Sequence, residues 1–171
     1  ATAATVSFAQ KKLTTTSGTI SFDATTKLDA LPKADNKTVV AALNTKTGEV
    51  AFEAVVKSFS FANPKMQEHF NGAQWMDSDK FPTATFKGKI TNLSAVKFTT
   101  DGTYTATVEG DLTLHGVTQK ITAPATITVS NKKVSASSDF TIKLADYGVN
   151  GPAIGAGKVS TDPKITVSAA F

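Results

Sequence analysis

Few side chains in this sequence could do catalytic or metal chemistry, and their spacing matches no familiar site. The two histidines, His69 and His115, stand far apart, and neither has the spacing of a metal ligand set. Glu68, Asp77 and Asp79 place three carboxylates in one stretch, which would suit a cation. Aspartates before a strand form turns far more often. We therefore predict no metal site and no catalytic residue.

Motifs for nucleophiles and phosphates are missing as well. The glycine-rich stretch 148–157 has neither the lysine nor the following helix of a phosphate-binding loop. No serine stands in a GxSxG elbow. An enzyme is consequently the least favoured class, and a turnover reaction would have to rest on His69 or His115.

Composition narrows the choice further. A length of 171 residues fits one domain with a real core. The net charge of +4 comes from scattered lysines without a single arginine, whereas nucleic-acid readers depend on arginine, so we expect no nucleic-acid partner. The absence of cysteine excludes disulfides and thiolate metal sites, and no apolar run approaches the ~18 residues of a membrane span.

One stretch, residues 63–70, predicts a short helix. Asn63 suits the N-cap and Pro64 the first helical position. Met66 and the phenylalanine that ends the stretch lie one turn apart on one face, and Gly72 is expected to end the helix in a left-handed conformation. Because two turns are marginal alone, we expect this insertion to pack as a lid or plug on a β structure.

The rest of the chain alternates between apolar and polar residues, which is typical of strands with one buried face. In the third strand the apolar residues of one face stand at even positions up to Val56, whereas Phe59 and Phe61 stand at odd positions. This shift by one residue predicts a β-bulge. Asp101-Gly102 predicts a two-residue hairpin turn, and Pro124 implies an edge or a bulge. We expect strands at 19–24, 38–44, 49–61, 83–90, 93–100, 104–114, 117–129, 134–144 and 165–171.

This pattern indicates an all-β antiparallel fold, either a barrel or a sandwich. The predicted inward face favours a barrel with a cavity, because it carries many small residues: Ala54, Ala84, Gly88, Ala106, Gly110, Ala125, Ala136 and Ser138. The alternative is a solid core in which small residues oppose large ones. For His115 we favour a bond to backbone groups near its turn, while His69 is equally compatible with a cavity mouth and with plain surface.

Three segments resemble the YceI-like family of periplasmic lipid-binding proteins. They are MQEHF at 66–70, DKFPTATFK at 79–87 and EGDLTLHGVTQKI at 109–121, and the element DYGV at 146–149 fits as well. The resemblance covers residues 18–171. Residues 4–18, ATVSFAQKKLTTTSG, depart from the family's usual start.

The resemblance implies a lipocalin-like eight-stranded antiparallel barrel with a short helical insertion near residues 63–80, forming a single domain over 1–171. It also implies a noncatalytic transport or carrier protein for a hydrophobic ligand (isoprenoid, fatty acid or amide), with no other cofactor. Family members are exported, so we expect a periplasmic or secreted protein whose signal peptide has been removed, as a monomer or homodimer. The alternative is a structural or stress-related interaction protein with a filled core and no ligand.

The apolar parity and the resemblance together select eleven candidate ligand-binding residues. Binding would come from apolar burial, with His69, Trp75 or a backbone group meeting the head group. The candidates are Phe52, Phe59, Phe61, Met66, His69, Phe70, Trp75, Phe81, Phe86, Ala106 and Val108.

Overall fold

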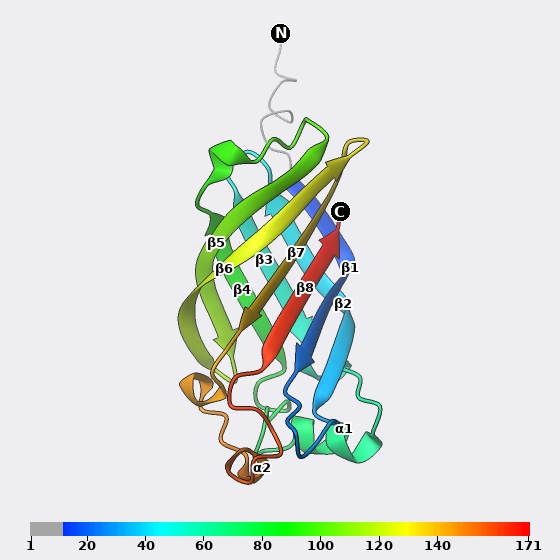
Figure 1. The fold of residues 1–171 in the computed structure, drawn as a ribbon, viewed down its shortest axis with the longest axis vertical. Coiled ribbons are helices and arrows are strands. Elements are labelled where there is room, and N and C mark those ends of the chain that lie inside the picture. The colour runs from blue at the N-terminus through cyan, green and yellow to red at the C-terminus, as the bar shows by residue number, and fades with distance from the viewer. Residues whose placement is uncertain (1–11) are drawn as a thin grey trace.

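A computed structural model describes residues 12–171, which form a closed antiparallel β-barrel (Figure 1). Each strand pairs with the next along the chain, and the last pairs with the first, as the sequence predicts for a lipocalin-like fold. Residues 1–11, which hold half of the unusual start, lie outside the described residues. The strands are β1 (Lys12–Asp23), β2 (Lys33–Asn44), β3 (Glu49–Val55), β4 (Thr83–Ile90), β5 (Gly102–Leu114), β6 (Val117–Ser130), β7 (Lys133–Thr141) and β8 (Lys164–Ala170).

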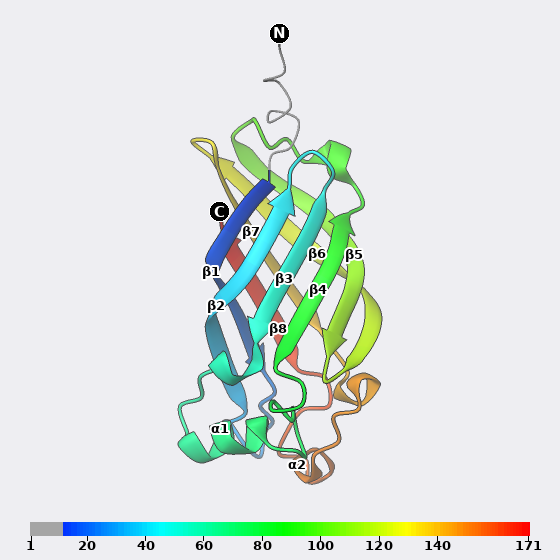
Figure 2. The ribbon, with the colours of Figure 1, turned by 180° about the vertical axis from the view of Figure 1, so that it is seen from behind.

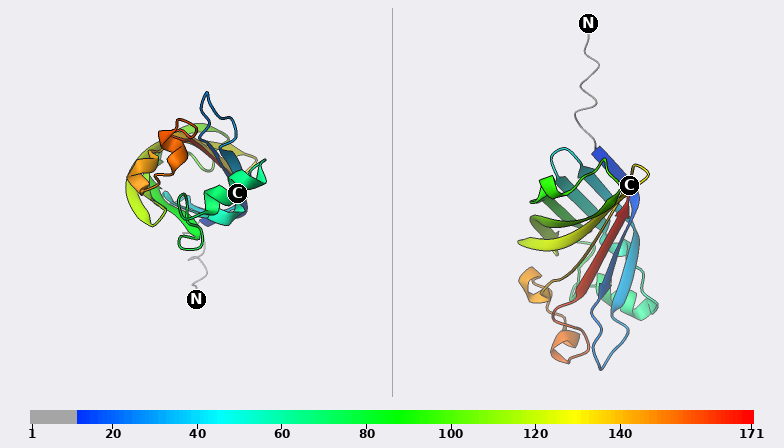
Figure 3. Two further views of the ribbon diagram at one scale, coloured as in Figure 1. Left: turned by 90° about the horizontal axis from the view of Figure 1, so that it is seen from below. Right: turned by 45° about the horizontal axis from the view of Figure 1, so that its top comes forward.

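The short helices gather at one end of the barrel, with one exception. That end carries η2 (Val56–Ser58), α1 (Pro64–Asn71), η4 (Leu144–Tyr147) and α2 (Pro152–Gly155). Seen along the barrel, α1 and α2 lie on opposite sides of the rim (Figure 3). The exception is η3 (Leu93–Ala95), in the β4–β5 connection at the other end (Figure 2). We call these the helical end and the closed end.

The predicted helix forms with the predicted start and a different stop. The Asn63 side chain accepts hydrogen bonds from the backbone N–H groups of Lys65 and Met66, at 2.9 and 3.1 Å, which confirms its role as N-cap. Gly72 follows the helix with φ −76° and ψ 166°, so the predicted left-handed stop is wrong. The chain instead enters a turn, in which the Gly72 carbonyl accepts from the backbone N–H groups of Trp75 and Asp77 at 3.0 and 2.9 Å.

The parity change before Phe59 comes from a 3₁₀ turn and not from a β-bulge. Strand β3 ends at Val55, and η2 rotates the chain so that Phe59 and Phe61 are both buried. Beyond this point the neighbouring strand holds the segment through side chains and a bridge. The buried Asn36 donates to the Val55 carbonyl at 3.0 Å, and Asp35 pairs with Ser60.

Residues 93–100 form a capping loop and not the predicted strand. Its Val96 is buried, and Leu93 and Phe98 pack beside it in the apolar cluster of the closed end. Asp101-Gly102 is likewise no hairpin turn, because β5 begins at Gly102. The tight hairpins lie at His115-Gly116 and Asn131-Lys132, where the backbone takes the left-handed conformation.

Strands β6 and β7 pair over only half of β6. Their ladder runs from Thr126–Ser137 to the hairpin, while the lower half of β6 pairs with β5 alone. Pro124 stands just where the ladder ends, in agreement with the predicted edge, and its carbonyl accepts a hydrogen bond from Ser138 Oγ at 2.6 Å. Below it η4 packs against β6, and Gln119 Nε2 donates a hydrogen bond to the Asp146 carbonyl at 2.9 Å.

Candidate ligand-binding site

The barrel encloses an apolar cavity of about 430 Å³. All eight strands contribute to its wall, through inward residues such as Phe22, Phe52, Ile90, Leu112 and Ala125. The side chains of the barrel therefore do not fill its interior, and the solid core considered from the sequence is wrong. Ligand cavities of proteins commonly measure ~300–1,000 Å³, and this volume falls within that range.

Small inward residues make the room, as predicted, although they do so in two ways. Ala54, Ala84, Ala125, Ala136 and Ser138 line the cavity directly. The glycines of the predicted set act through an aromatic ring. They pair across β4 and β5, and Cβ atoms built on them would come within 2.9 Å of the Phe86 ring, which itself lines the cavity.

Four phenylalanines form a continuous aromatic wall toward the helical end. Phe22 and Phe70 stack with their ring centroids 5.4 Å apart, and Phe61 lies 5.0 Å from Phe70. Phe59 packs against Phe22 at 5.5 Å. Helix α1 thus contributes Phe70 to the cavity wall, and Met66 lines the cavity one turn earlier.

The cavity opens at the helical end. His69 and Lys158 line it and are also exposed to solvent, and the half-buried Asp29 stands with them. At the closed end the lining residues Leu43, Ile90 and Ile127 are each at most 2% exposed. Among the described lining residues, Asp29, His69 and Lys158 alone carry ionisable side chains, so every such group lies at the mouth.

Trp75 closes part of this mouth. A Cβ atom built on Gly151 would lie 2.4 Å from the indole ring, so glycine at the start of α2 lets the ring lie directly on the backbone. The contact joins the segment after α1 to the segment that carries α2. Because Trp75 also lines the cavity and is the sole tryptophan of the chain, its fluorescence reports on this region.

His115 and Phe81 lie outside the cavity, at the β5–β6 turn. The His115 ring donates from Nδ1 to the carbonyl of Tyr147 at 2.9 Å, which agrees with a role in backbone hydrogen bonding. Phe81 packs against the same imidazole, with centroids 4.9 Å apart. Burial raises the pKa of the Tyr147 phenol above its ordinary value of 10.0, and the neighbouring Asp146 carboxylate raises it further.

The acidic residues of the insertion serve the local chain. Asp77 has φ 49°, and its carbonyl accepts from the backbone N–H groups of Lys80 and Phe81. Asp79 pairs with Lys57, which lowers the pKa of the Asp79 carboxyl. Among residues 12–171, no group of three or more histidine, aspartate or glutamate side chains is placed to hold a metal ion.

The structure brings nine of the eleven candidate residues together. The Phe81 ring packs against His115 of the β5–β6 turn and does not line the cavity. Ala106 is fully buried in the apolar cluster of the closed end and does not line it either. The lining also contains residues that the sequence analysis did not select, although their strands alternate plainly. They include Ile20, Phe22, Leu112, Leu114, Phe140 and Ile165, and the nine candidates in the lining are Phe52, Phe59, Phe61, Met66, His69, Phe70, Trp75, Phe86 and Val108.

Comparison with known sequences identifies a family. A family model described as the YceI-like domain matches residues 1–171. A UPF0312 protein of Pseudomonas putida (strain W619) is 37% identical over 106 residues, which are 58% of this chain and 50% of that protein. A UPF0312 protein of Pseudomonas savastanoi pv. phaseolicola is 31% identical over 141 residues, 79% of this chain and 60% of that protein. The chain thus spans about half the length of the first of these curated relatives.

Comparison with solved structures finds the same barrel. Burkholderia cenocepacia BcnA superposes with a TM-score of 0.73 at 17% identity, covering 90% of this chain and 96% of that one. A polyisoprenoid binding domain from Saccharophagus degradans, implicated in plant cell wall breakdown, gives a TM-score of 0.75 at 15% identity, covering 91% and 93%. At these identities the likeness establishes the fold.

Proposed function

The chain belongs to the YceI-like domain family, and on that premise we propose that it is a noncatalytic carrier that holds one long apolar chain, such as an isoprenoid or fatty chain, inside its barrel. The observation that carries the proposal is the apolar cavity of about 430 Å³. An engineered apolar cavity of about 150 Å³ already binds benzene. A much larger cavity walled by aliphatic and aromatic side chains suits a longer hydrocarbon.

The distribution of polarity along the cavity supports a ligand that enters chain first. Its interior offers apolar groups, which bind hydrocarbon by burial at about 25 cal/mol per Å². The ionisable groups Asp29, His69 and Lys158 all stand at the mouth. A polar head group would meet them there while the tail fills the barrel. The same separation supports binding without catalysis, because among the described residues no ionisable side chain lines the buried part of the cavity.

The polyisoprenoid binding domain among the structural neighbours favours an isoprenoid over a fatty acid or amide as the ligand class. The family resemblance predicts that the protein is released into the periplasm or the medium. A carrier there would hold an apolar ligand away from water. Among the described residues, no helix has the length and apolar character needed to cross a bilayer.

Two measurements test the carrier function. Native mass spectrometry of protein purified from its own host, followed by organic extraction, should find one hydrophobic molecule per chain. Delipidated protein titrated with a polyprenol or with palmitate should show saturable changes in Trp75 emission, since that ring lines the cavity. A protein that carries no lipid when fresh and shows no saturable emission change with either probe would overturn the proposal.

A further inference from the structure

The loop between β1 and β2, residues 24–32, holds two large apolar side chains out in solvent. Leu28 is 73% exposed and Leu31 is 47% exposed. A single exposed leucine is ordinary on a protein surface. Two of them within four residues, at the rim of an apolar cavity, require an explanation from the structure around them.

The loop is ordered by its own hydrogen bonds, so the exposure is a property of its fold. The Ala24 N–H donates to the Pro32 carbonyl at 2.8 Å and closes the loop at its base. Within it, Thr26 Oγ1 accepts from the Leu28 N–H at 3.1 Å, and Asp29 Oδ1 accepts from the Leu31 N–H at 2.8 Å. These bonds fix the backbone at both leucines and hold their side chains away from the core.

The same loop forms part of the cavity mouth. Asp29 and Pro32 line the cavity. Thr26 Oγ1 donates to the Gly157 carbonyl at 2.7 Å, which ties the loop to the segment that follows α2. The leucines therefore project from the rim through which a ligand would pass.

Lysines surround this apolar tip. Lys27 and Lys33 flank the leucines along the chain, and Lys158 stands beside Gly157 at the mouth; all three are exposed. Two carboxylates lie near them: Asp29 accepts a hydrogen bond from the loop backbone, and Asp23, which pairs with Lys33 across β1 and β2, accepts hydrogen bonds from Thr25. An apolar tip with cations around it is complementary to the surface of an anionic bilayer, which offers hydrocarbon beneath negative head groups.

We propose that the 24–32 loop docks the mouth of the barrel onto an anionic lipid bilayer. Leu28 and Leu31 enter the boundary between head groups and acyl chains, and the three lysines face lipid phosphates. The cavity mouth then opens against the membrane, so that an apolar ligand passes between bilayer and barrel without crossing water. This transfer step rests on the proposed function, whereas docking itself does not require an occupied cavity.

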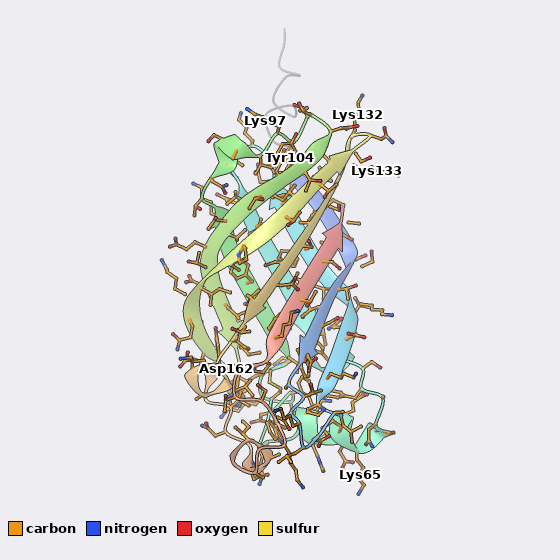
Figure 4. All side chains as sticks on the ribbon, viewed as in Figure 1. Lys65, Lys97, Tyr104, Lys132, Lys133 and Asp162 are labelled. Atoms are coloured by element: carbon orange, nitrogen blue, oxygen red, sulfur yellow. The ribbon has the colours of Figure 1, made fainter. Side chains whose placement is uncertain are left out.

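The main rival is docking by charge alone through the closed end. Figure 4 shows Lys97, Lys132 and Lys133 gathered at that end, far from α1. All three are exposed. Electrostatic attraction without apolar insertion would bring this end to the membrane and leave the cavity mouth in water.

Flotation with vesicles of phosphatidylcholine and phosphatidylglycerol separates the two orientations. The double variant Leu28→Ser/Leu31→Ser should lower the partition coefficient by about tenfold for each leucine removed. Val40→Ser/Val55→Ser is the matched control, because both valines are 48% exposed on the outer wall of β2 and β3, and it should bind as the unmodified chain does. Lys132→Glu/Lys133→Glu should likewise bind within about twofold.

Three results would overturn the docking proposal: no vesicle binding by the unmodified protein, full binding by the leucine variant, or loss of binding confined to the Lys132/Lys133 variant. Thermal unfolding of each variant confirms that the barrel is intact. The cavity-filling substitution Ala125→Phe separates this proposal from the carrier function, since it should impair lipid uptake and leave vesicle binding unchanged. Docking without uptake by the unmodified protein would contradict the carrier function alone.

Discussion

The Tyr147 phenol offers a pH-dependent test of the packing around η4. Tyr147 is 2% exposed, and burial, with a smaller effect of Asp146, raises the pKa of its phenol above 10.0. A raised pKa means that the folded state favours the neutral phenol. Its contribution to stability is therefore fully present below pH ~10 and is lost as the pH rises through the folded-state pKa.

We predict that the unmodified protein loses stability above pH ~10 relative to Tyr147→Phe, by up to ~1.4 kcal/mol per pH unit. Urea unfolding of both proteins across this range measures the difference, in which contributions from lysines cancel. Tyr104→Phe leaves Tyr147 as the one tyrosine of the chain, so that tyrosinate absorbance follows it alone. A midpoint at the ordinary value of 10.0 would contradict the prediction.

Phe81 shows where sequence reasoning fails at the scale of one residue. It stands in an aromatic-rich insertion and has the character of a cavity-wall residue. Its ring instead covers the β5–β6 turn, where a Cβ atom built on Gly116 would lie 2.5 Å from Phe81 Cε1. Nothing near Phe81 in the sequence encodes the position of that turn, because the contact depends on how β4 and β5 pair.

Among the elements, strands β4 and β5 approach each other closely at a pair of glycines, and we expect few substitutions to be tolerated there. Gly88 pairs with Gly110, and a Cβ atom on Gly110 would lie 2.3 Å from the Lys87 carbonyl oxygen and 2.8 Å from Phe86 Cζ. We predict that Gly110→Ala lowers the free energy of unfolding by about 1–3 kcal/mol, since backbone atoms on the neighbouring strand cannot easily move aside. Urea unfolding measures the loss.

Gly155→Ala provides the matched control for this substitution. It lies in α2 with nothing within 4 Å of a built Cβ atom, and alanine suits a helix better than glycine. Its stability should remain within about 0.5 kcal/mol of the unmodified protein. Equal stability of the two variants would show that the strand pair yields to the extra carbon.

The sequence predicts elements well where a local rule decides them. Alternation with period two locates most of the strands, and Asn63-Pro64 locates the start of α1. Local rules fail where tertiary packing decides. Residues 93–100 are predicted as a strand, yet they fold over the closed end, where Val96 is buried and Leu93 and Phe98 pack beside it. The parity change before Phe59 fits a bulge and a 3₁₀ turn equally well on sequence alone.

For the whole molecule, the decisive feature is that one end of the barrel is packed shut and the other is open. Leu43, Ile90 and Ile127 seal the closed end beneath the β4–β5 loop. The inward positions that form the wall follow from alternation, so the existence of a cavity could be predicted from its small residues. Its mouth could not, because Asp29, His69 and Lys158 come from three separate connections between strands, which only the closed barrel brings together.

Filling the cavity tests whether this space is where lipid binds. Ala125 lies in the cavity wall, opposite Ala106 on the neighbouring strand. We predict that Ala125→Phe lowers affinity for a polyprenol at least tenfold, because the new ring occupies volume that the hydrocarbon needs. The free energy of unfolding should change by less than about 1.5 kcal/mol, since the cavity of about 430 Å³ accepts the ring without overpacking.

Ala51→Phe makes the same chemical change on the outside of the barrel. Ala51 stands between Val50 and Phe52, which both line the cavity, so its own side chain points outward. This variant should bind polyprenol as the unmodified protein does, with affinity read in each case from Trp75 emission. If Ala125→Phe folds and binds as tightly as Ala51→Phe, the hydrocarbon lies outside the barrel. The apolar interior would then need another explanation.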